Sequence, residues 1–134
     1  MKPALIDTDI LSEFLRGHEK VVAHVDDYLK EFGHINISII TYYEILNGLL
    51  YKDAKKQLEK FEAFVKLNRV IPLTVKTARS AATIQADLRK RGAEIGHTDT
   101  LIAGIALTNK LQLVTNNVNH FKRVKGLNVA NWTK

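Results

Sequence analysis

The residues Ala4-Leu5-Ile6-Asp7-Thr8-Asp9-Ile10-Leu11 begin as a short apolar run and continue as an acidic, amphipathic segment. The pattern predicts a buried strand over about residues 4–7 and a helix directly after it. Ligand sites in open α/β sheets form beyond the carboxyl ends of strands, so Asp7 is the first candidate for a chemical role. Alternatively, Asp7, Thr8 or Asp9 only caps the helix, since Asp and Thr are good N-cap residues.

The composition predicts one folded domain spanning residues 1–134. Hydrophobic residues make up 46% of the chain, which is enough for a core and too many for a disordered protein. The absence of cysteine excludes disulfides and thiolate metal sites. No apolar run approaches the roughly 20 residues that span a bilayer, and no signal segment precedes the first strand. We therefore expect a cytoplasmic protein without a membrane partner.

The net charge of +6 favours an anionic partner, which could be nucleic acid, an acidic protein or a membrane surface. Many small domains carry a modest excess of lysine, so the charge alone decides little.

Strand and helix patterns alternate along the chain. Strands are expected at about 4–7, 35–37, 70–73, 111–114 and 127–130. Helices are expected over 8–16, 19–32, from Ser38 or Thr41 to about residue 50, and over 52–67, 74–91 and 99–109, the last with Thr98 as its N-cap. Strands separated by helices imply an α/β fold with a parallel sheet that is covered on both faces.

Three acidic residues stand in apolar surroundings rather than on polar helix faces. Asp7 ends the first strand, Glu44 lies within Tyr42-Tyr43-Glu44-Ile45-Leu46, and Asp99 begins an apolar helix. Ionised carboxylates beside buried surface are costly unless they are paired or bind a cation. Oxygen-rich sites suit Mg²⁺ or Mn²⁺, and such ions support phosphodiester hydrolysis. Alternatively, Glu44 pairs with a lysine and Asp99 only complements a helix N-terminus.

Four stretches together resemble the PIN-domain ribonucleases, and more closely the VapC-type toxins of prokaryotic toxin–antitoxin pairs. They are Ile6-Asp7-Thr8-Asp9-Ile10-Leu11, Tyr43-Glu44-Ile45-Leu46-Asn47-Gly48, Asp99-Thr100-Leu101-Ile102-Ala103, and Leu113-Val114-Thr115-Asn116-Asn117 followed by Phe121. The stretches occur in the family's order and cover nearly the whole chain. The resemblance implies a three-layer α/β/α sandwich with a central parallel sheet and Mg²⁺-dependent cleavage of RNA. Members of the family act on tRNA or on ribosomal RNA loops, and tRNA is the expected substrate here. It also implies a homodimer and a VapB-like antitoxin whose tail lies across the active site.

The resemblance also assigns roles to individual residues. Asp7, Glu44 and Asp99 match the family's metal-binding acids. The fourth acidic position departs from the broader PIN pattern, because the chain reads Thr115-Asn116-Asn117 there. We therefore expect one well-held Mg²⁺, with a second arriving with the phosphate. Asn117 is added as a catalytic candidate and Asp9 as a further site candidate, while the Thr115 hydroxyl could hold a water or a phosphate, or only pack at the strand end.

Two other functions remain open from the residues. Asp7-Thr8-Asp9 resembles the opening of haloacid-dehalogenase-type phosphatases, but that family also needs a lysine and a late acidic pair. The missing fourth acid is also compatible with a non-catalytic RNA-binding module. Tyr42, Tyr43 and Tyr51 could stack on bases or line a dimer or antitoxin groove, although packing is the favoured interpretation.

Overall fold

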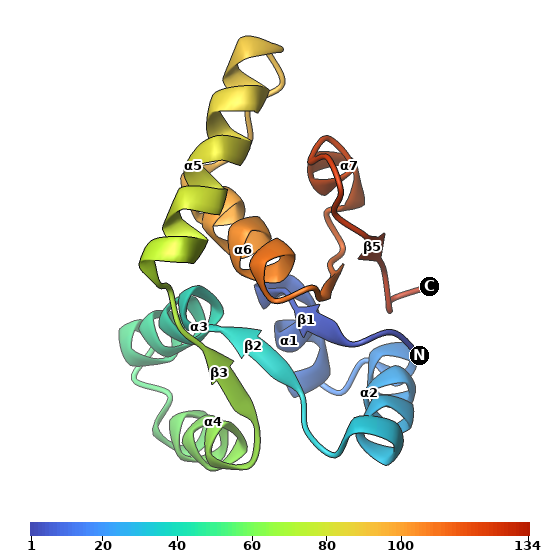
Figure 1. Ribbon diagram of the computed structural model, residues 1–134. Helices are drawn as coiled ribbons and strands as arrows, with labels where there is room; N and C mark the ends of the chain where they lie inside the picture. Colours follow the sequence, from blue (N-terminus) through green and yellow to red (C-terminus); the bar gives the residue numbers. More distant parts are fainter.

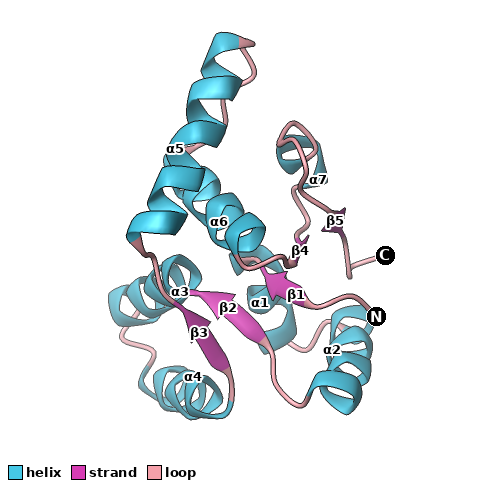
Figure 2. Cartoon of the chain, viewed as in Figure 1, coloured by secondary structure: helices cyan, strands magenta, loops and turns pink.

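The computed structural model describes residues 1–134 as five strands and seven helices (Figure 2). The strands are β1 (Ala4–Ile6), β2 (Asn36–Ser38), β3 (Arg69–Ile71), β4 (Gln112–Val114) and β5 (Val129–Ala130). The helices are α1 (Thr8–Leu15), α2 (Glu19–Phe32), α3 (Ile39–Tyr51), α4 (Lys55–Leu67), α5 (Val75–Lys90), α6 (His97–Thr108) and α7 (Val118–Phe121). None of these helices is long and apolar enough to cross a membrane.

The five strands form one parallel sheet in the order β3-β2-β1-β4-β5. In β1, Leu5 lies opposite Asn36 of β2 on one side and Leu113 of β4 on the other. Helices α1 to α4 lie on one side of the sheet in Figure 1, and α5 and α6 lie on the other. The predicted three-layer α/β/α sandwich with a central parallel sheet is therefore confirmed.

The apolar run of β1 contributes to both halves of the core. Ala4 and Ile6 belong to a cluster with residues of α1, α2 and α4, whereas Leu5 belongs to a second cluster with residues of α5 and α6. Each of the three side chains is at most 1% exposed. A strand that is buried on both faces needs consecutive apolar residues, which explains why β1 lacks an alternating pattern.

Helices α5 and α6 pack antiparallel at unusually short range (Figure 1). A Cβ atom built on Gly104 of α6 would lie 2.9 Å from the Thr77 carbonyl oxygen and 2.9 Å from the Ala81 backbone nitrogen, both in α5. Only glycine fits that approach without a shift of backbone. This contact fixes α6, and therefore its first turn, relative to the sheet.

Several predicted helix ends are confirmed, and two are wrong. Thr74 caps α5 through a reciprocal capping box with Thr77, as the sequence predicted for the start of that helix. The predicted N-cap Thr98 instead lies inside α6, which is capped by Gly96. The predicted helix 52–67 begins only at Lys55, because Asp53 takes a left-handed φ of 53° that helices do not tolerate.

Packing of the three tyrosines is confirmed for only one of them. Tyr42 stacks on Phe61 with ring centroids 5.7 Å apart, and its hydroxyl is 3.0 Å from a carboxylate oxygen of Glu62. Tyr43 and Tyr51 are 64% and 88% exposed, because they lie on the face of α3 that turns away from the core.

Candidate metal site at the carboxyl edge of the sheet

The candidate site lies where the strand order reverses. The chain adds β2 and β3 on one side of β1 and then crosses to add β4 and β5 on the other. The carboxyl ends of β1 and β4 therefore border a crevice of the kind in which α/β proteins bind ligands. Asp7 follows β1 and Thr115 follows β4, so the fold places two polar side chains directly at this crevice.

Asp7 is held in place from both strands. Its Oδ1 accepts a hydrogen bond from the backbone N–H of Thr8 at 2.8 Å, so it caps α1 as well. Its Oδ2 accepts a hydrogen bond from the Thr115 hydroxyl at 2.7 Å. Asp7 therefore caps α1 and also occupies the candidate site, so the two interpretations of this residue do not exclude each other. Burial, with a smaller contribution from the neighbouring Asp9, raises the pKa of the Asp7 carboxyl from 3.8 to about 7.

Asp9 lies two residues after Asp7, in the first turn of α1. Its carboxylate accepts hydrogen bonds from the backbone N–H groups of Asn116 at 3.0 Å and Ile10 at 2.7 Å. Burial raises the pKa of the Asp9 carboxyl, and the hydrogen bonds only partly oppose that effect. Asp9 therefore links the start of α1 to the segment after β4.

Glu44 reaches this edge from α3. Its Oε1 accepts a hydrogen bond from the Thr8 hydroxyl at 2.7 Å, and that hydroxyl lies 2.9 Å from the Thr41 hydroxyl. Glu44 forms no ion pair, so the alternative of a lysine partner is not realised. The two threonine hydroxyls orient the carboxylate without neutralising it.

Asp99 arrives from the first turn of α6. Burial raises the pKa of its carboxyl; the nearby His120 opposes this, while Glu44 and Asp9 add to it. The Asp99 Oδ2 atom is 4.0 Å from the Nδ1 atom of His120. Asp99 and Glu44 are thus close enough to repel each other although 55 residues separate them in the sequence.

Asn117 lies beside this group rather than within it. Its side-chain nitrogen is 2.7 Å from the Nδ1 atom of His120, and its backbone N–H donates to the Thr115 hydroxyl at 3.0 Å. The structure therefore brings Asp7, Asp9, Glu44 and Asp99 to one edge and connects Asn117 to it through His120. The sequence assigned no role to His120 or Thr8, which contact Asp99 and Glu44. The Thr115 hydroxyl donates to Asp7 and does not face solvent.

The donor set fits a hard divalent cation. Asp7 and Asp9 form no ion pair with lysine or arginine, as found for Glu44, and Asp99 meets only His120. The available donors are carboxylate oxygens, which Mg²⁺ and Mn²⁺ prefer. No three acidic or histidine side chains are arranged to enclose an ion by themselves. This openness suits Mg²⁺, which usually binds through one or two carboxylates and keeps several waters.

The comparison with protein families gives a match over most of the chain. The model of the PIN domain family matches residues 4–127. The chain belongs to the PIN-domain family. The phosphatase alternative loses support, because the lysine that it requires forms no ion pair with Asp7 or Asp9.

Curated relatives of this PIN-domain protein are VapC proteins. Ribonuclease VapC2 of Rickettsia felis is 29% identical over 131 residues, which cover 97% of this chain and 98% of the relative. The tRNA(fMet)-specific endonuclease VapC of Salmonella typhimurium is 32% identical over 112 residues, which cover 79% of this chain and 85% of the relative. The protein is thus a VapC-type member of the family.

Solved structures give the same assignment. In the crystal structure of VapBC2 from Rickettsia felis bound to a DNA fragment from their promoter, the matching chain has a TM-score of 0.88 and 27% identity, with 96% of this chain and 98% of that chain covered. The DNA-bound VapBC structure from Salmonella typhimurium matches with a TM-score of 0.87 and 26% identity, over 98% of this chain and 99% of that chain.

Proposed function

We propose that this VapC-type protein is a divalent-cation-dependent endoribonuclease and the toxin of a type II toxin–antitoxin pair. Asp7, Glu44 and Asp99 are the proposed metal-binding acids, one or two of them in direct contact with the ion and the rest through its waters, and Mg²⁺ is the proposed cation. The observation that supports this most is the group of carboxylates at the strand-order reversal, none of which has a lysine or arginine partner in a chain of net charge +6. The ribonuclease relatives support the reaction class.

Each side chain has a distinct part in this proposal. Asp7 supplies carboxylate oxygens from the end of β1 and Asp99 from the first turn of α6, and Thr115 holds Asp7 in one orientation. The Thr8 hydroxyl does the same for Glu44. A divalent cation at such a site supplies a water of lowered pKa and offsets negative charge on the phosphate. Asn117 is uncharged, so its part is to orient substrate.

The substrate and partners follow from the relatives. We infer tRNA as the substrate class, because one relative is named a tRNA(fMet)-specific endonuclease. We infer a VapB-like antitoxin, because the matching structures are VapBC assemblies. Leu50, Tyr51 and Val75 are 54%, 88% and 88% exposed, which provides apolar surface for an antitoxin and for a homodimer. A cytoplasmic location fits an RNA substrate.

The test is cleavage of total tRNA by the purified protein with Mg²⁺, Mn²⁺ or EDTA. We expect cleavage with Mg²⁺ and none with EDTA. Asp7→Asn and Asp99→Asn should each lower the cleavage rate at least about a hundredfold, because changes even behind metal ligands cost 10- to 100-fold. Asp27→Asn, at an exposed position of α2 on the other side of the sheet, is the control and should leave the rate essentially unchanged.

Two results would contradict this function. Tight binding of tRNA without products, at every metal concentration, would indicate a non-catalytic RNA-binding module. Equal rates for Asp7→Asn and Asp27→Asn would remove the carboxylate edge from the reaction. Circular dichroism of each variant establishes that a lost rate is not a lost fold.

A further inference from the structure

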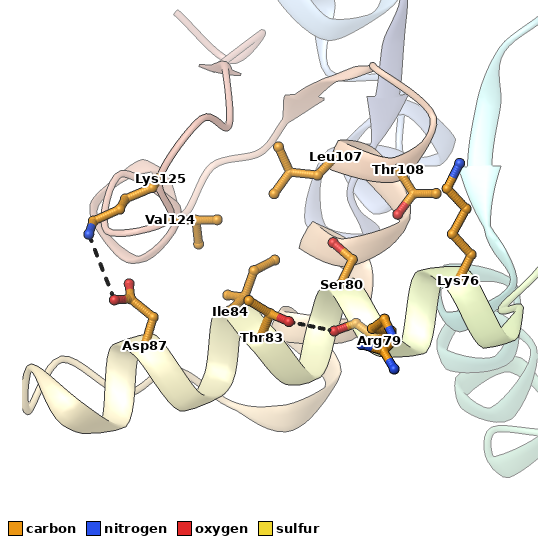
Figure 3. A pocket seen from close by; sticks show the side chains of 10 residues that line it. All are labelled: Lys76, Arg79, Ser80, Thr83, Ile84, Asp87, Leu107, Thr108, Val124 and Lys125. Atoms are coloured by element: carbon orange, nitrogen blue, oxygen red, sulfur yellow. Dashed lines mark hydrogen bonds and ion pairs between the residues drawn. The ribbon is translucent and has the colours of Figure 1, made fainter.

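A groove with a different character lies on α5, away from the acidic edge (Figure 3). It has a volume of about 630 Å³ and is bounded by α5, the end of α6 and the segment that follows α7. Its apolar wall is formed by Ile84, Leu107 and Val124. This volume falls in the range of pockets that hold small organic ligands, a size class that includes nucleotides.

Cationic side chains border the groove on several sides. Lys76 and Arg79 stand on α5 and form no ion pair, while Lys125 stands across the groove with its Nζ atom 3.8 Å from the Asp87 carboxylate (Figure 3). Arg91 also pairs with Asp87, at 2.8 Å, so that carboxylate is already compensated. The positive charge of Lys76 and Arg79 is therefore available to an anionic ligand.

Hydroxyl groups lie between the cations and the apolar wall. Ser80 and Thr108 line the groove, with Thr108 at the end of α6. Such hydroxyls donate hydrogen bonds to phosphate and sugar oxygens in protein–nucleic acid complexes. An apolar wall, hydroxyls and unpaired cations together match the three parts of a nucleotide, namely its base, its sugar and its phosphate.

The groove is separate from the acidic edge but within reach of the same RNA. Asp99 lies in the first turn of α6 and Thr108 ends that helix, which places them about 14 Å apart along its axis. Asn117 and Lys125 likewise stand before and after α7. An RNA chain held in the groove therefore has only a short path to the carboxylates.

We propose that this groove binds a nucleotide of the RNA substrate at a distance from the cleaved bond. The proposal rests on the proposed ribonuclease function. Without a bound cation the acidic edge repels a polyanion, so cationic side chains elsewhere on the molecule contribute to RNA binding. When Lys76 and Arg79 neutralise phosphates of the RNA, counterions bound to the RNA are released, and this release favours binding. The groove then sets affinity for long RNA, and the carboxylates set the rate of hydrolysis.

The test compares two double variants of equal charge. Lys76→Gln with Arg79→Gln alters the groove, and Lys20→Gln with Lys30→Gln alters exposed positions of α2 on the opposite side of the sheet. Binding of total tRNA is measured in EDTA, which prevents cleavage, over a range of salt concentrations. The groove variant should bind about tenfold more weakly at 0.1 M salt, and its log–log salt dependence should be shallower by about 1.4 to 1.8. The α2 variant should match the unaltered protein.

Cleavage supplies an independent readout. The groove variant should raise KM for tRNA while kcat stays unchanged, and it should cleave a short oligonucleotide at the unaltered rate. Equal affinity and equal salt dependence in the two double variants would overturn the proposal. So would unchanged tRNA binding together with weakened binding of polyglutamate, since that pair of results assigns the groove to an acidic protein.

The two proposals fail separately. Groove-dependent binding of tRNA by a protein that cleaves nothing would support the groove and contradict the hydrolytic function. Mg²⁺-dependent cleavage with no effect of the groove variant would do the reverse. Unfolding temperatures of both double variants guard against a folding defect, which substitutions at exposed helical lysine and arginine positions are not expected to cause.

Discussion

The carboxylates of Asp7 and Asp87 stand in opposite electrostatic surroundings within one small domain. Asp87 lies at the surface of α5, where its hydrogen bonds from Arg91, and more weakly the charge of Lys125, hold its pKa below the usual range. Asp7 lies buried at the end of β1, and its pKa rises to about 7. One carboxylate is compensated by the chain, and the other is left without a cation.

The difference indicates which acids serve the fold and which serve a ligand. The chain has 20 lysine and arginine residues against 14 acidic ones, so cations were available for pairing. They are nevertheless absent from the group formed by Asp7, Asp9, Glu44 and Asp99. A buried charge without a partner costs stability. A metal ion bound from solution would neutralise these carboxylates and remove that cost.

The largest effect that tests this contrast is on stability without metal. The folded-state pKa of Asp7 is raised, so its stabilising contribution is present below pH 3.8 and is lost as the pH rises through about 7. Above pH 7 in EDTA, Asp7→Asn should therefore increase the free energy of unfolding, by roughly 4 kcal/mol at most. Urea unfolding at pH 5 and pH 8 measures it.

The matched variant responds in the opposite sense. Asp87 has a lowered pKa, so it stabilises the fold above its unfolded-state pKa, and Asp87→Asn should lose a little stability at pH 8. Adding Mg²⁺ should stabilise the unaltered protein at pH 8 more than at pH 5, where protons compete for Asp7. A loss of stability in Asp7→Asn at pH 8 in EDTA would contradict the assignment of Asp7 as an uncompensated charge.

The sequence predicts much of the fold, because its signals are local. The apolar runs of β1 and β4 and the capping residues Thr74 and Ser38 each act within a few residues, and the structure confirms them. The break at Asp53 was missed because a left-handed residue depends on how α3 and α4 must turn to pack. Likewise, Gly96 rather than Thr98 caps α6. Glycine and threonine are both accepted at N-caps, so the local sequence did not decide between them.

The site was predicted only as a set of residues. The spacing of Asp7, Glu44 and Asp99 contains no information about distance, and it was the resemblance to a family that grouped them. The structure places them along one edge, yet their supporting contacts were not foreseeable. The hydrogen bond from Thr115 to Asp7 joins residues 108 positions apart, and only the strand order brings them together.

A packing change tests the close contact between α5, which carries the groove, and α6, which carries Asp99. Gly104→Ala places a Cβ atom 2.9 Å from backbone atoms of α5, so it should destabilise the fold by about 1–3 kcal/mol. Gly48→Ala in α3 is the control, because it meets nothing within 4 Å and should stabilise the helix by about 0.5–1 kcal/mol. Urea unfolding separates the two variants. Equal stability would show that α5 yields freely, and the groove would then lack a rigid wall.

The subtlest test concerns the hydroxyl that orients Asp7. Thr115 is fully buried, and Thr115→Val keeps its shape but removes the donor to the Asp7 Oδ2 atom and the acceptor for the Asn117 N–H. If the carboxylate is a metal ligand, loss of its orienting partner should raise the Mg²⁺ concentration for half-maximal cleavage by about 10- to 100-fold. Thr115→Ser retains the hydroxyl and should recover most of that loss. A merely structural role predicts instead that both variants cleave with unaltered Mg²⁺ dependence, whatever their unfolding temperatures. Asp87 has no orienting hydroxyl of this kind, because its partners are the charged, solvent-facing side chains of Arg91 and Lys125. Asp87→Asn should therefore leave the Mg²⁺ concentration for half-maximal cleavage unchanged.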